Sequence, residues 1–354
     1  MIRFFKDKEV GFLYFYIHFI CEVTCFFVLS KLFDLPVFMW TVALFYDAFA
    51  FVPQSIFGYI SDKFPNLKLG LIGLALLIIA TLVCSIENYE LVYIVLLILC
   101  IGNCLIHVEG AETTLRSSNG KMSNSSIFVG GGSFGVITGK IFAEIGISYY
   151  AIIVLIISAI PFVLYATYFK NDDEIVKPCI NFNYHNKNIN PYVTILLAVL
   201  VVIVRGYMGY GIPTTWRKSL LEKVIFYFAM GFGKCLGGIL IDKIGIRKTS
   251  FISMIFSIPF LVFGDNLIYV SLIGVAFFSM SMAITLAILV SVLPLKPGLA
   301  FGLTTIGLFL GSAPIFVVKI TSIYINVVMI VTLSILCFMA LKYITNKDDR
   351  YANK

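Results

Sequence analysis

Long apolar segments recur along almost the whole chain, and they restrict it to folds that place most residues in a membrane. The 354 residues are 60% hydrophobic and 13% charged, whereas typical soluble domains are about 45–50% apolar and about 25% charged. A helix that spans a bilayer needs about 20 mostly apolar residues. We therefore predict an all-α integral membrane protein with twelve transmembrane helices, near residues 11–30, 37–60, 68–86, 89–110, 125–146, 149–169, 191–212, 223–241, 249–265, 267–291, 298–318 and 321–344.

The positions of Lys and Arg predict how these helices are oriented. Of the 26 Lys and Arg residues, 18 fall at the two termini and on one side, and six fall on the other side. Because cytoplasmic loops carry an excess of these residues, both termini are expected in the cytoplasm. Arg217 and Lys218 are the local exception. The net charge of +7 follows from these loops, so we expect no nucleic-acid partner. The first apolar segment lacks a small-residue cleavage site and is expected to be retained.

One polar stretch, residues 170–190, divides the predicted helices into two groups of six. We predict an N-terminal bundle over 1–169, a cytoplasmic linker over 170–190 and a C-terminal bundle over 191–354. No nucleophile–base set appears at a plausible spacing, so an enzyme is not expected. Seven of the eight Cys lie in apolar segments and none forms CxxC, which indicates buried thiols. We therefore predict no metal site and no cofactor.

A short pattern occurs twice, about half a chain apart. Residues 58–68 read GYISDKFPNLK and residues 237–248 read GGILIDKIGIRK. In each copy a Gly is followed four residues later by Asp and then by Lys, at Gly58, Asp62 and Lys63 and at Gly238, Asp242 and Lys243. This spacing places Gly and Asp on one face of a helix. The Gly admits a neighbouring helix, and the Asp can reach an N–H group or a cation across the contact.

This pattern resembles the signature of the major facilitator superfamily, G-x-x-x-D-[RK]-x-G-x-[RK]-[RK], which lies between helices two and three and recurs between helices eight and nine. The second copy matches throughout, at Gly238, Asp242, Lys243, Gly245, Arg247 and Lys248. The first copy departs at Pro65 and Leu67 and keeps Lys68. The resemblance implies two pseudo-symmetric six-helix bundles, gating loops at both copies, and alternating access around a site at the midplane.

Two stripes of glycine support the internal repeat. Gly131, Gly135 and Gly139 lie on one face of the fifth predicted helix, and Gly307 and Gly311 lie at matching positions of the eleventh. Small residues at this spacing let helices pack closely in lipid. In the family that the chain resembles, helices five and eleven line the boundary between the halves. We therefore predict these glycines at that interface.

Ionisable groups inside a membrane are costly and are candidates for function. His18 and Glu22 lie four residues apart on the first helix, which lines the central cavity in the family that the chain resembles. Burial favours the neutral form of a carboxylate, so Glu22 is a candidate proton carrier that His18 could tune. A buried pair without a role in transport is the alternative. Asp47 is a further candidate, and Arg205 could bind a substrate anion or neutralise Glu22.

Polar residues on two other helices complete the candidate set. Asn103 and His107 share a face of the fourth helix and are predicted to face the cavity. Lys234, one helical turn before the second motif glycine, is predicted at a gate or interface rather than at the substrate. Glu112 and Arg116 are expected to form a solvated pair near the membrane edge.

These features together predict a secondary active transporter of a small organic solute, coupled to protons. The alternatives are a drug or metabolite efflux antiporter and a membrane sensor or scaffold that uses the same fold without flux. Short loops and abundant Ile, Phe, Asn and Lys are similar to transporters of low-GC Gram-positive bacteria. We therefore expect a monomer in a bacterial cytoplasmic membrane, whose partners are a small-molecule substrate, protons and the lipid bilayer.

Overall fold

The computed structural model describes residues 9–35, 38–64, 66–170, 182–316 and 322–346. Its first group of helices is α2 (Glu9–Phe33), α3 (Met39–Phe51), α4 (Pro53–Lys63), α5 (Leu69–Cys84), α6 (Val92–Arg116), α7 (Ser123–Glu144) and α8 (Tyr149–Lys170). The second group is α9 (Pro191–Gly211), α10 (Leu220–Ile244), α11 (Ile246–Phe251), α12 (Ser257–Phe263), α13 (Ile268–Ser279), α14 (Ser281–Val292), α15 (Pro297–Ser312) and α16 (Ile323–Ile344). Both termini, Pro65 and most of the predicted linker lie outside the described residues.

The apolar segments form helices at the predicted places. Ten described helices are long and apolar enough to cross a bilayer, and α5 is a shorter apolar helix. The second predicted segment is divided into α3 and α4 at Val52, where the next residue is Pro53. A proline lacks the backbone N–H that would continue the helical hydrogen bonds. The all-α membrane fold is confirmed, and the count of twelve spans stays a prediction.

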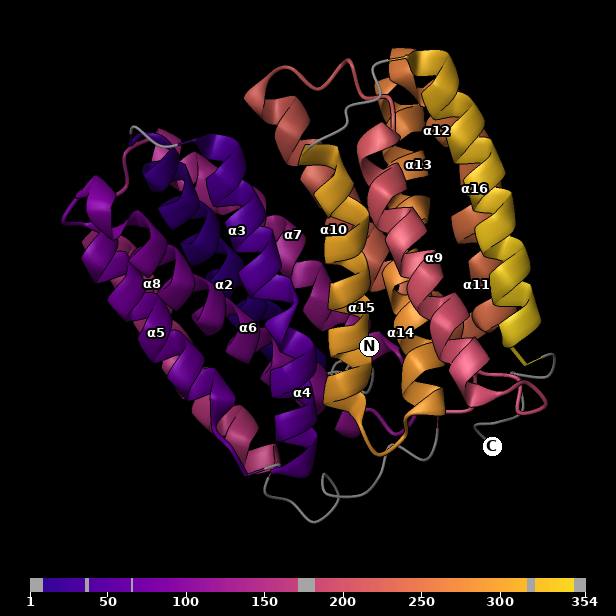
Figure 1. The fold of residues 1–354 in the computed structure, drawn as a ribbon, viewed down its shortest axis with the longest axis horizontal. Helices are drawn as coiled ribbons and strands as arrows, with labels where there is room; N and C mark the ends of the chain where they lie inside the picture. The colour runs from indigo at the N-terminus through magenta and orange to yellow at the C-terminus, as the bar shows by residue number, and fades with distance from the viewer. Residues whose placement is uncertain (1–8, 36–37, 65, 171–181, 317–321, 347–354) are drawn as a thin grey trace.

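The helices lie in two groups side by side (Figure 1). Helices α2–α8 form one group, coloured indigo to magenta, and helices α9–α16 form the other, coloured pink to yellow. We call them the N half and the C half. Two helix pairs carry most of the contact between them: α7 packs against α10, and α4 packs against α15.

The first motif aspartate joins the halves at the end of α4. Asp62 Oδ1 accepts a hydrogen bond from the Gly298 N–H at 2.9 Å, and Oδ2 accepts one from the Leu299 N–H at 2.8 Å. These N–H groups belong to the first turn of α15, where a helix carries partial positive charge and lacks internal partners. A carboxylate of the N half therefore caps a helix of the C half.

The second motif aspartate makes the same contact in the opposite direction. Asp242 Oδ1 accepts from the Met122 N–H at 2.8 Å, and Oδ2 accepts from the Ser123 N–H at 3.0 Å, at the start of α7. A carboxylate of the C half therefore caps a helix of the N half. We call the two contacts the reciprocal caps, and the end of the molecule that carries them the motif end.

The motif glycines allow this close approach. A Cβ on Gly58 would lie 2.5 Å from the carbonyl carbon of Gly298, and one on Gly238 would lie 2.5 Å from the Met122 carbonyl oxygen. Real Cβ atoms do not tolerate such distances, so any side chain would push the halves apart. The first position of each motif copy is therefore glycine for a steric reason at the interface.

The rest of the second motif copy organises its own half. Gly245 has φ +87°, in the left-handed region that favours glycine. Arg247 donates to the carbonyl oxygens of Lys342 at 3.0 Å and Thr345 at 2.8 Å, at the end of α16. The motif lysines are exposed and project from the motif end: Lys63, Lys68, Lys243 and Lys248.

The predicted glycine stripes face inward, within each half, which corrects their assignment to the interface. A Cβ on Gly131 or Gly139 would collide with the α2 backbone at Phe15 or Val23, and Gly135 also packs on α2. On α15, Gly307 packs on Val202 and Gly311 on Ile203 of α9. Both stripes let a neighbouring helix of the same half approach closely.

Other residues of the same two helices meet the opposite half. A Cβ on Gly130 would lie 3.1 Å from the Gly231 carbonyl oxygen of α10, and one on Gly302 would lie 2.7 Å from the Gln54 carbonyl oxygen of α4. A helix presents several faces, and spacing alone does not say which neighbour each face meets.

The reciprocal caps predict a stability effect. In Asp62→Asn and Asp242→Asn, one accepting oxygen becomes an NH2 donor that faces a backbone N–H. Each variant should lose about 1–3 kcal/mol of stability, measured by thermal unfolding of the purified protein in detergent. Asp34→Asn is the matched control because Asp34 is exposed. Equal melting temperatures for all three variants would contradict the capping role.

Candidate functional site

A cavity of about 530 Å³ lies between the N half and the C half. Residues of α2, α3, α6 and α7 line one wall, and residues of α9, α10, α13, α14 and α15 line the other. The lining continues beyond the end of α9 to Thr214 and Arg217. The segment that joins α9 to α10 lies at the end of the molecule opposite the motif end (Figure 1). Cavities of about 300–1,000 Å³ hold small organic ligands.

The titratable side chains of this cavity are divided between its walls. The N half contributes two acids and two histidines, His18, Glu22, Asp47 and His107. The C half contributes three cations, Arg205, Arg217 and Lys234. A ligand between the halves therefore meets acceptor groups on one side and cationic donors on the other.

His18, Glu22 and His107 converge in one buried cluster, which we call the triad. Glu22 Oε1 lies 3.4 Å from His107 Nε2 and 3.8 Å from His18 Nε2. The two imidazole rings are 4.3 Å apart between centroids and nearly perpendicular, at 78°. All three side chains are at least nine-tenths buried, with 5–7% exposure. Each of the three residues is a predicted cavity residue, and the structure brings them together.

Hydrogen bonds to the backbone set the protonation of both rings. His18 Nδ1 lies 2.8 Å from the Phe128 carbonyl oxygen, and His107 Nδ1 lies 2.9 Å from that of Asn103. A carbonyl oxygen only accepts, so each Nδ1 carries the proton. In the neutral rings each Nε2 is then an acceptor. Without a further proton, the triad would hold three acceptor atoms facing one another.

Asn103 and Tyr46 support the triad from behind. Asn103 Nδ2 donates to Glu22 Oε1 at 2.8 Å and also lies 3.2 Å from the Tyr46 hydroxyl. Asn103 has no exposed surface, so it holds the carboxylate instead of facing the cavity as predicted. Its amide fixes Oε1 in the position where both Nε2 atoms point.

The triad has the side chains of a metal site as well as those of a proton site. Its three candidate ligand atoms lie within 4.8 Å of one another, and the two Glu22 distances of 3.4 and 3.8 Å are near the roughly 3.4 Å between ligands around tetrahedral zinc with bonds of about 2.1 Å. A proton needs only one short contact between two of these atoms. The absence of a metal stays a prediction.

Arg205 and Glu22 do not pair in this structure. Among the described residues, Glu22 has its close ionic contacts with the two histidines, and Arg205 has none within 4.0 Å. Arg205 instead stacks on Phe278, with its guanidinium carbon 3.1 Å from the ring centroid. Of the two roles predicted for Arg205, anion binding is the one that this arrangement leaves open.

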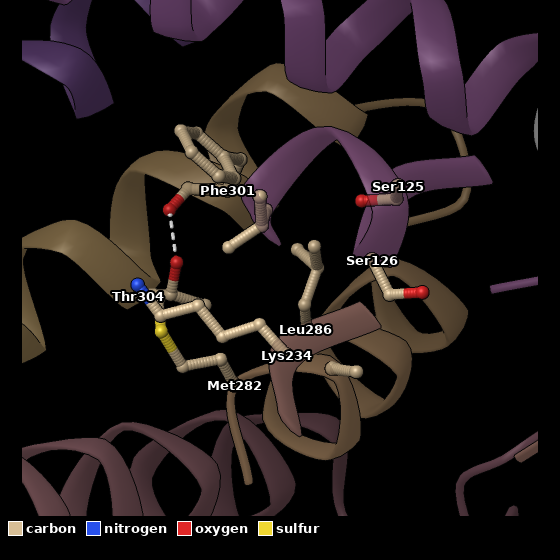
Figure 2. Close-up of a pocket in the computed structure, with 9 residues that line it drawn as sticks. Ser125, Ser126, Lys234, Met282, Leu286, Phe301 and Thr304 are labelled. Carbon is tan, nitrogen blue, oxygen red and sulfur yellow. Dashed lines mark hydrogen bonds between the residues drawn. The ribbon is translucent and has the colours of Figure 1, made fainter. Parts of the chain in front are cut away.

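Lys234 lies beside the cavity as well as near the interface. Figure 2 shows its side chain reaching from α10 past Leu286 toward Met282 and Thr304. It also lines the main cavity. The prediction that Lys234 serves a gate rather than the substrate is therefore too narrow, because the side chain borders the space where a ligand would lie.

The expected solvated pair at the end of α6 is buried, which corrects that prediction. Glu112 has no exposed surface and accepts hydrogen bonds from Ser61 and from Arg116 Nε, the latter at 3.0 Å. Arg116 also lies 3.5 Å from Asp62 Oδ1. These groups extend the cap at Asp62 into the N half, because a buried charge needs partners.

Sequence reasoning missed several partners of the site. Phe278 and Phe301 sit in largely apolar segments with other aromatic or aliphatic residues, where nothing distinguishes them from lipid-facing rings. Arg217, by contrast, could be noticed in the sequence, because it lies on the predicted side that carries few Lys and Arg residues. It stacks over Phe226 at 4.3 Å and lines the cavity, which explains why a cation remains on that side.

Comparisons with known proteins place the fold. No protein family profile and no curated protein matches the chain. Among solved structures, the Escherichia coli fucose:proton symporter FucP has a TM-score of 0.58 at 14% identity, over 94% of this chain and 98% of that one. The human organic anion transporter MFSD10 (TETRAN) has a TM-score of 0.63 at 13% identity, over 95% and 99%. FucP in its outward conformation, titled a major facilitator superfamily transporter, has 0.53 at 15%, over 92% and 98%. The chain therefore has the fold of the major facilitator superfamily.

Proposed function

We propose that the protein is a secondary transporter, which moves a small organic solute across a membrane by alternating access and couples this movement to protons. The observation that carries the proposal is a cavity between two halves, which the reciprocal caps join at the motif end and whose lining includes the triad. The solved structures with the same fold include proteins titled as a proton symporter and as an organic anion transporter.

The caps support alternating access. At the motif end, both carboxylates bond to backbone N–H groups of the opposite half, while the cavity lining continues toward the other end. If the halves rock, the caps break at one end as new contacts form at the other. Because the caps are hydrogen bonds to a helix end, they can break and re-form without rearranging a packed core.

The triad supports proton coupling. One proton placed between Glu22 Oε1 and a histidine Nε2 turns a repulsive set of acceptors into a hydrogen bond. The triad can therefore take up and release a proton when its surroundings change. Buried titratable groups of this kind are typical of proton relays in transporters.

Phe301 would make the surroundings of the triad depend on how the two halves are positioned. It belongs to α15 of the C half, and its ring faces that of His107 at an angle of 24° with centroids 6.4 Å apart. It also packs on Phe128, whose carbonyl holds His18. Movement of α15 relative to α6 would carry the Phe301 ring away from the triad, so water would reach the triad in only one of the two states of the transporter.

The wider predictions stay part of this proposal. We propose that the motif end faces the cytoplasm, on the basis of the Lys and Arg bias, and that the protein works as a monomer in a bacterial cytoplasmic membrane. The two halves, over 1–169 and 191–354, would move as bodies joined by the linker over 170–190. Efflux antiport and a sensor without flux are the competing outcomes.

Glu22→Gln tests the coupling. The full-length protein is reconstituted in liposomes that contain a pH-sensitive dye, and solutes are screened for those that move protons. For such a solute, Glu22→Gln should retain downhill exchange, but its accumulation ratio under a pH gradient should fall to about one, because the coupling free energy is lost. His185→Gln is the matched control, since His185 bonds Ser291 away from the cavity.

Wild-type accumulation in Glu22→Gln would contradict the coupling. If no solute moved protons or crossed the membrane, the sensor or scaffold alternative would replace the transporter.

Phe301→Ala tests whether the Phe301 ring shields the triad from water. Without its ring, water should reach the triad in both states, so proteoliposomes should leak protons in the absence of any solute, at a rate several-fold above wild type. Phe309→Ala is the control on the same helix, at a position that does not line the cavity. A leak equal to that of wild type in both variants would show that Phe301 does not seal the triad.

A further inference from the structure

Arg205 is a buried cation that faces the cavity with part of its guanidinium unused. It lies on α9, is 5% exposed and lines the cavity. Among the described residues, no carboxylate oxygen lies within 4.0 Å of its nitrogens. A buried charge without a counter-ion costs several kcal/mol. Retention of such a group at a cavity wall indicates a partner that comes from outside the chain.

Phe278 holds this guanidinium by its face and by one N–H group. The ring of Phe278 covers the face, with the guanidinium carbon 3.1 Å from the ring centroid. The Phe278 carbonyl oxygen also accepts a hydrogen bond from Nη2, and it accepts another from the Ser281 hydroxyl at 2.9 Å. These contacts orient the plane of the guanidinium beside the cavity that Arg205 lines, and they leave Nε and Nη1 buried without a partner among the described residues.

The free hydrogens form one complete edge. Nε and Nη1 have no hydrogen-bond partner among the described residues. Nη2 carries two hydrogens, one on each edge of the guanidinium, and it uses only one for Phe278. The hydrogen that remains free on Nη2 lies parallel to the N–H of Nε on one edge, or to an N–H of Nη1 on the other edge. Arg205 therefore keeps two parallel N–H groups, the arrangement that binds both oxygens of a carboxylate.

The chain's own acids do not fill this edge. Glu22 is held by Asn103 and faces the two histidines, and Asp47 lies on α3 in the opposite wall without a close contact to Arg205. Arg217 and Lys234 also line the cavity, so its charge balance alone does not select a monoanion over a dianion. The selection comes from shape, because a planar carboxylate matches two parallel N–H groups and adds the least repulsion with the acids of the opposite wall.

The surroundings of Arg205 are apolar and aromatic. Phe278 belongs to a cluster with Phe226 and Val275, against which Tyr227 and Met230 pack, and all of these line the cavity. A ligand whose charged group reaches Arg205 would therefore place its body against hydrocarbon surface. This favours an amphipathic acid over a polyhydroxylated solute.

We propose that Arg205 is the docking site for the carboxylate of an organic monocarboxylic acid, whose apolar body lies against the Phe226–Phe278 cluster. The identification of this ligand as cargo rests on the proposed transport function, whereas the site itself does not. Arg205 would bind the carboxylate through its free edge, and Phe278 would position the guanidinium.

Binding to the purified full-length protein in detergent tests the site. The probes are acetate, hexanoate, phenylacetate and indole-3-acetate, each compared with its neutral amide, and phenyl phosphate serves as the dianion. We expect the larger carboxylates to bind by calorimetry and the amides to bind at least about tenfold more weakly, equal to about 1.4 kcal/mol. Arg205→Gln should lose the same factor. Arg205→Lys should bind at an intermediate level, because it keeps the charge without the planar edge.

The controls separate binding from folding. Lys223→Gln removes an exposed cation and should bind like wild type. Without ligand, Arg205→Gln should melt at or above the wild-type temperature, because it removes an unpaired buried charge. If Arg205 were merely structural, this variant would melt lower.

Several results would overturn the proposal. These are equal binding of acids and amides, equal binding by Arg205→Gln, binding of phenyl phosphate alone, or no binding of any carboxylate. If carboxylates bound through Arg205 but no solute crossed a membrane, the site would stand and the transport function would fall. If only neutral solutes moved protons, the transport function would stand and the site would fall.

Discussion

Two carboxylates that cap helices of the opposite half hold this molecule in its present shape. Asp62 bonds to the start of α15 and Asp242 to the start of α7. The first N–H groups of a helix have no partners within that helix, so each cap satisfies donors of a helix in the opposite half and joins the halves in the same contact. The glycines beside them bring the backbones close enough for those bonds. The cavity lies between the halves that these caps join.

Polar groups inside the molecule follow from the same constraint. Each buried acid at the described positions has specific donors: Glu22 has Asn103, Glu109 has Tyr14 and the Gly70 N–H, and Glu112 has Ser61 and Arg116. Arg205 differs because its partners are a ring and a carbonyl oxygen, which leave donors unused. The contrast matters because the satisfied groups stabilise the fold, whereas the unsatisfied one has capacity for a ligand.

The sequence predicted much of the fold, since span length and apolar composition are local properties. Helices form at the predicted segments, and the motif aspartates reach N–H groups across a helix contact, as their position beside glycine indicated. His18, Glu22 and His107 were predicted from the cost of burying polar groups. Their convergence on one oxygen was not, because it depends on how α2 and α6 pack.

The wrong predictions also concern the packing between helices. The glycine stripes were assigned to the wrong neighbour, and Glu112 was placed in solvent, because spacing along one helix does not identify what faces it. Phe278 is 73 residues from Arg205 and is surrounded by other apolar residues, so no local pattern marks it as the partner. Residues whose role arises from contact between distant segments were beyond prediction from a single sequence.

The reciprocal caps also bear on how such a protein can change over evolution. Each aspartate bonds to main-chain N–H groups, at Met122, Ser123, Gly298 and Leu299, and every amino acid except proline supplies that group. The hydrogen bonds therefore require the carboxylate of the aspartate but, on the donor side, only that the residue is not proline. Homologues could keep this contact with no signature of the bond itself at the donor positions, although Gly298 must also stay small because a Cβ there would lie 2.6 Å from the Gly58 carbonyl oxygen.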